Sequence, residues 1–180
     1  MTDSLFFAVL FAAFLHAVWN FFAKGRSPQP GLSIALAQTL SGVAVFPFVI
    51  HLIDSQIRWD GVLLSGFVHA IYVWFLGRSY ERGDITVVYP ISRGLGVAGT
   101  ALLGSLFLQD SFSFWGYFGI LFVVAGTLIM GFSRAKGKAA SGLHYAVIVG
   151  ICVSFYSSID KVAVATCAPV LFFSLTCILS

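Results

Sequence analysis

The chain has 180 residues, of which 59% are hydrophobic and only 9% are charged, and its formal net charge is +3. Because a water-soluble domain normally has about 25% charged residues, this composition excludes an ordinary soluble protein. The small net charge gives no reason to expect a nucleic-acid partner. Apolar runs of about 20 residues recur along the chain, and each is enough to cross a hydrocarbon core of roughly 30 Å. The sequence therefore predicts an all-α polytopic membrane protein that is surrounded by the lipid bilayer.

Six complete spans are predicted in chain order, at residues 5–23, 32–53, 61–79, 85–108, 112–132 and 143–165. The first run lacks a preceding basic segment and a convincing cleavage site, so we expect a retained span and not a signal peptide. A seventh apolar run begins near Ala168 and reaches Ser180. About 13 residues of helix cover only roughly 20 Å, so we expect a chain that stops inside a span, as a truncated product or a fragment would.

The basic segment SRAKGKAASG at 133–142 predicts a flexible linker between two units, 1–132 and 143–180. Lysine and arginine gather in the connections on one side of the membrane, at Lys24, Arg26, Arg78, Arg82, Arg134, Lys136 and Lys138. On the other side lie Arg58 and Lys161. By the positive-inside rule, we expect the linker in the cytoplasm and the N-terminus outside it, in what is most simply a bacterial cytoplasmic (inner) membrane.

A weak internal repeat relates the two units. An offset of 137 residues places 14–24 over 151–161 without gaps, so that Trp19 meets Tyr156 and Lys24 meets Lys161. A unit of five spans is odd-numbered, so its second copy would enter the membrane from the opposite side. The sequence therefore predicts an inverted-topology pair, which is a common architecture of secondary transporters.

The fourth span contains the two residues that are energetically least favourable in a membrane-spanning helix. It opens with GDITVVYPISRG at 83–94, which puts Pro90 and Arg93 inside an apolar run. Proline removes a helix hydrogen-bond donor, and an arginine at mid-membrane costs about 2.5–3.5 kcal/mol on insertion scales. Polar and small residues form one helical stripe here, namely Thr86, Tyr89, Arg93, Gly96 and Thr100. We expect this span to line a polar cavity, with Arg93 in one of three roles: solute or anion recognition, a structural ion pair or carbonyl clamp, or snorkelling.

Spans one and three carry further polar stripes. In span one, His16, Asn20 and Lys24 are four residues apart, with Trp19 beside them, and His69 and Tyr72 share a face of span three. A histidine such as His16 either titrates near neutral pH or serves as a satisfied hydrogen-bonding group. The residues expected to line the cavity are His16, Trp19, Asn20, His69, Tyr72, Tyr89, Pro90 and Arg93.

The remaining spans are less informative. Asp160 is the acid nearest to a span interior, in span six. Span one has no glutamate, which weighs against a small multidrug pump, where such a residue binds the cation and protons. Span five is nearly all apolar and is expected to be a packing or dimerisation helix. No metal-ligand spacing, phosphate loop or hydrolase motif occurs in the sequence, so neither a cofactor nor an enzyme is expected.

Taken together, these features resemble the drug/metabolite transporter superfamily, and within it an EamA-domain protein. The resemblance is carried by LHAVWNFFAK at 15–24, YERGDITVVYPISRGLG at 80–96 and YAVIVGICVSFYSSIDK at 145–161. It implies ten helices in two inverted five-helix repeats, of which this chain holds the first repeat and the start of the second. It also implies export or exchange of metabolites, amino acids or drugs around a central cavity.

The function expected from the sequence is therefore secondary transport of a small organic solute by alternating access. Coupling to protons or another ion and assembly as a homodimer are both compatible with this reading. Two alternatives stay open. The chain is either a membrane assembly partner that transports nothing itself, or a flippase for a lipid-linked substrate on the same fold.

Overall fold

The computed structural model describes residues 29–53, 57–134 and 137–180, together with Phe6, Phe7, Leu10, Phe11, Phe14, Leu15 and Val18. Within these residues the regular structure is helical. The elements are α2 (Pro30–Val49), η1 (Ile50–Leu52), α3 (Trp59–Arg82), α4 (Ile85–Phe107), α5 (Phe114–Arg134), η2 (Gly137–Gly142), α6 (Leu143–Ala163) and α7 (Pro169–Leu179). Most of the predicted first span lies outside the described residues.

Five segments of the described chain are long and apolar enough to cross a membrane: Pro30–Leu52, Trp59–Arg82, Ile85–Phe107, Phe114–Ser133 and Leu143–Ala163. They correspond to predicted spans two to six, with ends that differ from the predicted ones by a few residues. The shorter apolar helix α7 begins at Pro169, close to the predicted start of the seventh run. The expectation of an all-α polytopic membrane protein is therefore confirmed.

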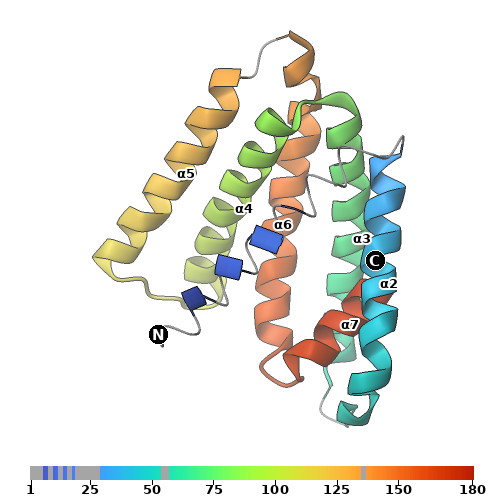
Figure 1. Cartoon of the computed structure of the whole chain (residues 1–180). Coiled ribbons are helices and arrows are strands. Elements are labelled where there is room, and N and C mark those ends of the chain that lie inside the picture. Colours follow the sequence, from blue (N-terminus) through green and yellow to red (C-terminus); the bar gives the residue numbers. More distant parts are fainter. Residues whose placement is uncertain are drawn as a thin grey trace.

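Helix α6 lies between α3 and α4, as Figure 1 shows, and packs against both of them. Helices α3 and α4 follow each other in the chain but touch each other little. On the outer side of α4 lies α5, while α2 and α7 pack together and against α3. Helices that are distant in sequence are thus neighbours in the bundle, and α6 joins its two sides.

Local sequence signals set the ends of these helices. Asp84 caps the start of α4, because its carboxylate accepts hydrogen bonds of 2.8 Å from both the backbone nitrogen and the hydroxyl of Thr86. A side chain that satisfies a first-turn donor in this way typically contributes about 1 kcal/mol. Helices α2 and α7 both begin with proline, at Pro30 and Pro169, where the missing N–H would have had no partner in the helix.

Close packing of α4 on α6 depends on glycine. A Cβ at Gly96 would lie 2.7 Å from Cγ1 of Val153, and a Cβ at Gly150 would lie 2.7 Å from Cβ of Leu95. Small residues let helix backbones approach in this way where the hydrophobic effect gives little help. Gly119 and Gly126 on α5 differ, because a Cβ on either would meet nothing within 4 Å.

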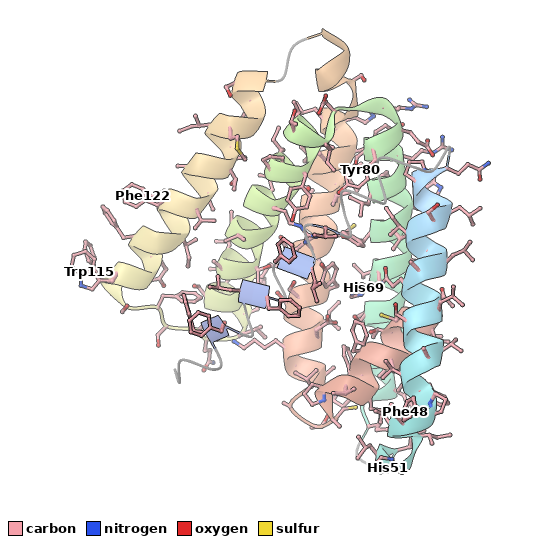
Figure 2. The ribbon with its side chains drawn as sticks, in the orientation of Figure 1. Phe48, His51, His69, Tyr80, Trp115 and Phe122 are labelled. Carbon is pink, nitrogen blue, oxygen red and sulfur yellow. The ribbon has the colours of Figure 1, made fainter. Side chains whose placement is uncertain are left out.

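The outer face of α5 carries large apolar side chains. Trp115 is 77% exposed and Phe122 is 67% exposed, and both project away from the bundle in Figure 2. This pattern is that of a helix whose outer face meets lipid or another protein. Homodimer formation through span five stays a prediction.

Different polar contacts connect the segments at the two ends of the bundle. At one end, Lys161 near the end of α6 forms an ion pair with Asp110 in the connection between α4 and α5. At the other end, the Ser141 hydroxyl donates a hydrogen bond to the backbone carbonyl of Arg82. Helix η2 in the basic linker thus lies against the α3–α4 turn. These segments carry several of the cationic residues that were predicted to share one side of the membrane.

Candidate solute pocket

A pocket of about 550 Å³ opens among five helices of the described chain, α2, α3, α4, α6 and α7. Its volume is in the range of sites for small organic molecules, about 300–1,000 Å³. Part of the wall is apolar, including Ile34, Leu76 and Phe172. The polar part comprises chiefly Gln38, His69, Tyr72, Arg93, Tyr156 and Asp160.

Arg93 lies on α4 and turns its guanidinium toward tyrosines of three helices. The guanidinium sits over the ring of Tyr89, with its central carbon 5.4 Å from the ring centroid. It also donates hydrogen bonds to the hydroxyl oxygens of Tyr72 on α3 and Tyr156 on α6. Because Arg93 lines the pocket, its charge faces the bundle interior, and it does not snorkel to the membrane surface.

The aromatic rings next to Arg93 form one cluster. The ring centroids of His69 and Tyr156 are 4.0 Å apart, with the planes tilted by 31°. Those of Tyr72 and Tyr156 are 5.5 Å apart in an edge-to-face arrangement, and those of His69 and Tyr72 are 6.2 Å apart. Such pairs stabilise one another modestly and hold their rings in defined orientations. The tyrosine hydroxyls are thereby directed at a fixed point, which is the guanidinium.

A second polar group lies on the same wall. The hydroxyl of Ser65 on α3 donates a hydrogen bond to Oδ1 of Asp160 on α6. The Nδ1 atom of His69 is 3.2 Å from the Ser65 hydroxyl and 3.0 Å from the Ser65 carbonyl oxygen. Ser65 is fully buried, while His69 and Asp160 reach the pocket. The pocket therefore has a cationic group on α4 and an acidic group on α6.

The predicted cavity residues fall into three groups. His69, Tyr72 and Arg93 line the pocket. Tyr89 is half-buried and lies behind Arg93, while Pro90 is buried in the second turn of α4, and neither contributes to the lining. His16, Trp19 and Asn20 lie outside the described residues. That these residues bind a solute stays a prediction.

Among the lining residues that were not predicted are three with polar side chains, Gln38, Tyr156 and Asp160. Weak signals pointed to each of them. Gln38 is a polar residue within an apolar span, and Asp160 is the acid closest to a span interior. The 137-residue offset pairs Tyr156 with Trp19, itself a predicted site residue. What the sequence did not indicate is that these side chains converge, because Gln38 lies on α2 whereas Tyr156 and Asp160 lie on α6.

Nothing in the described part of the chain gathers three or more histidine, cysteine or acidic side chains in a way that could hold a metal ion. The three cysteines, Cys152, Cys167 and Cys177, are free and buried, as is usual for cysteines that pack as small apolar residues. The chemistry that the pocket offers is therefore that of hydrogen bonding, charge and aromatic contact.

Two curated proteins are similar to part of this chain. The Multidrug resistance protein EbrB of Bacillus atrophaeus is 33% identical over 78 residues, which is 43% of this chain and 65% of that protein. The protein of the same name from Bacillus subtilis (strain 168) is 35% identical over 76 residues, which is 42% of this chain and 63% of that protein. The chain thus spans a little under two thirds of the length of these relatives. No solved structure matches it significantly.

A family model described as Small Multidrug Resistance protein matches residues 31–123, from the start of α2 into α5. The matching family is thus a family of multidrug exporters. The match does not support the more specific expectation of an EamA-domain protein. Its members are membrane transporters and not enzymes. Because the match covers just over half of the sequence, the chain belongs to the Small Multidrug Resistance family.

Proposed function

We propose that this protein is a secondary transporter that exports a small organic solute across the cytoplasmic membrane, and that the pocket described above holds the solute. The observation that carries the proposal is the position of Arg93. Its charge lies inside the bundle, on the wall of a cavity of about 550 Å³, and faces tyrosine hydroxyls from other helices. An ionisable residue at this depth is costly, which favours a role in handling the solute.

The pocket suits a solute that has an apolar body and a polar or charged end. Tyr72, Tyr156 and Phe172 offer aromatic surface, and Arg93 offers donors that are already oriented by the tyrosines. Binding to such a preorganised group avoids the entropic cost of ordering the side chain when the solute arrives. Arg93 would meet an anionic or hydrogen-bonding group of the solute, while Asp160, which also lines the pocket, would meet a donor.

Alternating access would come from two units that rock around the pocket. The first unit is 1–132, the second begins at 143, and 133–142 connects them. Under the 137-residue offset, α7 is the counterpart of the first part of α2. These two helices pack together, and the Ser174 hydroxyl donates a hydrogen bond of 2.8 Å to the Gly42 carbonyl. Contact between counterparts is expected where two units are related by a two-fold axis. It supports the inverted repeat of the EamA-type arrangement.

The experiment is uptake and efflux by proteoliposomes that contain the full chain. The panel is tetraphenylphosphonium as a lipophilic cation, benzoate as an aromatic anion and phenylalanine as a zwitterion. We expect at least one of them to move faster than in protein-free liposomes, and Arg93→Gln to slow that solute. If none of the three solutes moves, but the chain still associates with another membrane protein, the result would favour the alternative of a membrane assembly partner that transports nothing itself. Scrambling of a fluorescent lipid instead would favour the flippase.

A further inference from the structure

A separate pocket of about 380 Å³ lies between the start of α2 and the end of α3. In Figure 1 both segments are at the upper end of the bundle, which also carries η2. Its lining includes Leu32 on α2 and Trp74, Arg78 and Glu81 on α3. Among the described residues, those that line this α2–α3 pocket and those that line the solute pocket form two sets with no member in common. The transport proposal therefore makes no use of its chemistry.

The α2–α3 pocket is a recess beside a close contact between two backbones. A Cβ at Gly77 would lie 2.8 Å from the backbone nitrogen of Gly31, so α2 and α3 meet there without side chains between them. Both glycines contribute to the lining. The larger side chains of Leu32 and Trp74 stand beside this contact, and each is 55% exposed. The recess thus offers apolar surface that the bundle itself does not cover.

The length of α3 places this pocket at the level of the lipid headgroups. The helix has 24 residues and is therefore about 36 Å long, whereas the hydrocarbon core of a bilayer is roughly 30 Å thick. Its last turn, with Arg78 and Glu81, accordingly reaches the headgroup region. Trp74 lies one turn deeper, at the boundary between hydrocarbon and headgroups, where tryptophan is enriched in membrane proteins. A ligand of this pocket would most simply come from the bilayer.

The α2–α3 pocket carries one cation and one anion that are only loosely paired. Nη1 of Arg78 lies 3.4 Å from Oε2 of Glu81, and an exposed pair of this kind contributes little to stability. The guanidinium also lies over Trp74, with its central carbon 5.5 Å from the ring centroid. The Arg58–Asp60 pair at the other end of α3 is different, because two contacts of 2.5 and 3.3 Å join its groups. Arg78 and Glu81 therefore keep hydrogen-bonding capacity for a ligand.

We propose that the α2–α3 pocket binds the headgroup of phosphatidylethanolamine, a phospholipid with a phosphate and a primary ammonium group. The guanidinium of Arg78 donates hydrogen bonds to the phosphate oxygens. The carboxylate of Glu81 accepts a hydrogen bond from the ammonium group. Leu32 and the exposed part of Trp74 contact the apolar part of the lipid below the headgroup. One positive and one negative charge in the lining thus match the two charges of a zwitterionic headgroup.

The same arrangement predicts a preference among phospholipids. Phosphatidylglycerol has the phosphate but no cation, so Glu81 would face a like charge instead of a partner. Phosphatidylcholine is zwitterionic, but its quaternary ammonium has no N–H to donate to Glu81. An aromatic face that attracts such an ammonium is partly taken, because Arg78 already lies over Trp74. Phosphatidylethanolamine is the one of these three lipids that satisfies both charged side chains.

The test is native mass spectrometry of the full chain, released from detergent micelles after titration with phosphatidylethanolamine, phosphatidylglycerol or phosphatidylcholine of identical acyl chains. We expect phosphatidylethanolamine to bind about two- to tenfold more tightly than either other lipid, which corresponds to one hydrogen bond. Arg78→Gln should weaken the binding of all three. Glu81→Gln should weaken phosphatidylethanolamine and strengthen phosphatidylglycerol, because the lining becomes net positive. A folding defect would not produce this gain.

Two variants serve as charge-matched controls. Arg82→Gln removes a cation at the same end of α3, and Asp60→Asn removes an anion at the other end, and neither residue lines the α2–α3 pocket. Both should keep the preference for phosphatidylethanolamine. Equal binding of the three lipids, tightest binding of phosphatidylglycerol, or an unchanged preference in Glu81→Gln would overturn the proposal. So would soluble glycerophosphoethanolamine that binds as tightly as the lipid, because the ligand would then be a free solute.

Discussion

The imidazole of His69 on α3 lies against the ring of Tyr156 on α6, with the ring centroids 4.0 Å apart. Through the Tyr156 hydroxyl this contact continues to Arg93 on α4. Three helices are therefore connected at one level of the bundle, next to the pocket. A shift of α6 relative to α3 would separate these groups, so the cluster is sensitive to the rocking motion that alternating access requires.

Substituting Tyr156 by phenylalanine tests the hydroxyl apart from the ring. Tyr156→Phe keeps the stacking on His69 and loses the hydrogen bond from Arg93. We expect a small loss of stability, about 0.5–1.5 kcal/mol for one hydrogen bond, and a weaker affinity for the transported solute. Thermal unfolding in detergent and the half-saturating solute concentration of flux measure the two effects. Unchanged half-saturation would show that this hydroxyl does not orient Arg93 for binding.

The packing of α4 on α6 predicts a difference between two glycines. At Gly96 a new Cβ would lie 2.7 Å from Val153, whereas at Gly126 it would meet open space. We expect Gly96→Ala to destabilise the protein by about 1–3 kcal/mol relative to Gly126→Ala, as overpacking does. Both changes raise helix propensity equally, so Gly126→Ala is a matched control. Equal unfolding temperatures for the two variants would contradict the close contact of these helices.

The predicted orientation is tested by the accessibility of single cysteines. Glu81 and Ser113 are both exposed and lie near opposite ends of the bundle. In a background without the three native cysteines, Glu81→Cys should react with a membrane-impermeant maleimide only after cells are permeabilised. Ser113→Cys should react in intact cells. The reverse pattern would place the basic linker outside the cytoplasm.

The sequence predicted the helices well, since runs of apolar residues follow directly from the thickness of the bilayer. It also predicted that Arg93 faces a cavity, because the cost of that residue in lipid is a local property. The order of the helices in space could not be predicted. The position of α6 between α3 and α4 depends on glycine contacts such as Gly96 with Val153, which a single sequence does not pair.

The same limit applies to the site. Gln38, Tyr156 and Asp160 each lie on a different turn or helix, and they meet only after folding. The missing glutamate of the first span was also given too much weight. It does not exclude the Small Multidrug Resistance family, to which residues 31–123 match. In the pocket that we propose as the solute site, the acidic side chain is that of Asp160 on α6, which lies beyond the matched segment.

The most direct test of the account is solute flux in proteoliposomes of the unaltered protein, Arg93→Gln and Trp115→Ala, prepared at equal protein density. Trp115 is exposed on α5, a helix that contributes no residue to the pocket lining, so Trp115→Ala should transport normally. Arg93→Gln should lose about tenfold or more in flux at low solute concentration, because a hydrogen bond to a charged group is removed. Equal flux in Arg93→Gln and in the unaltered protein would contradict the assignment of this pocket as the solute site.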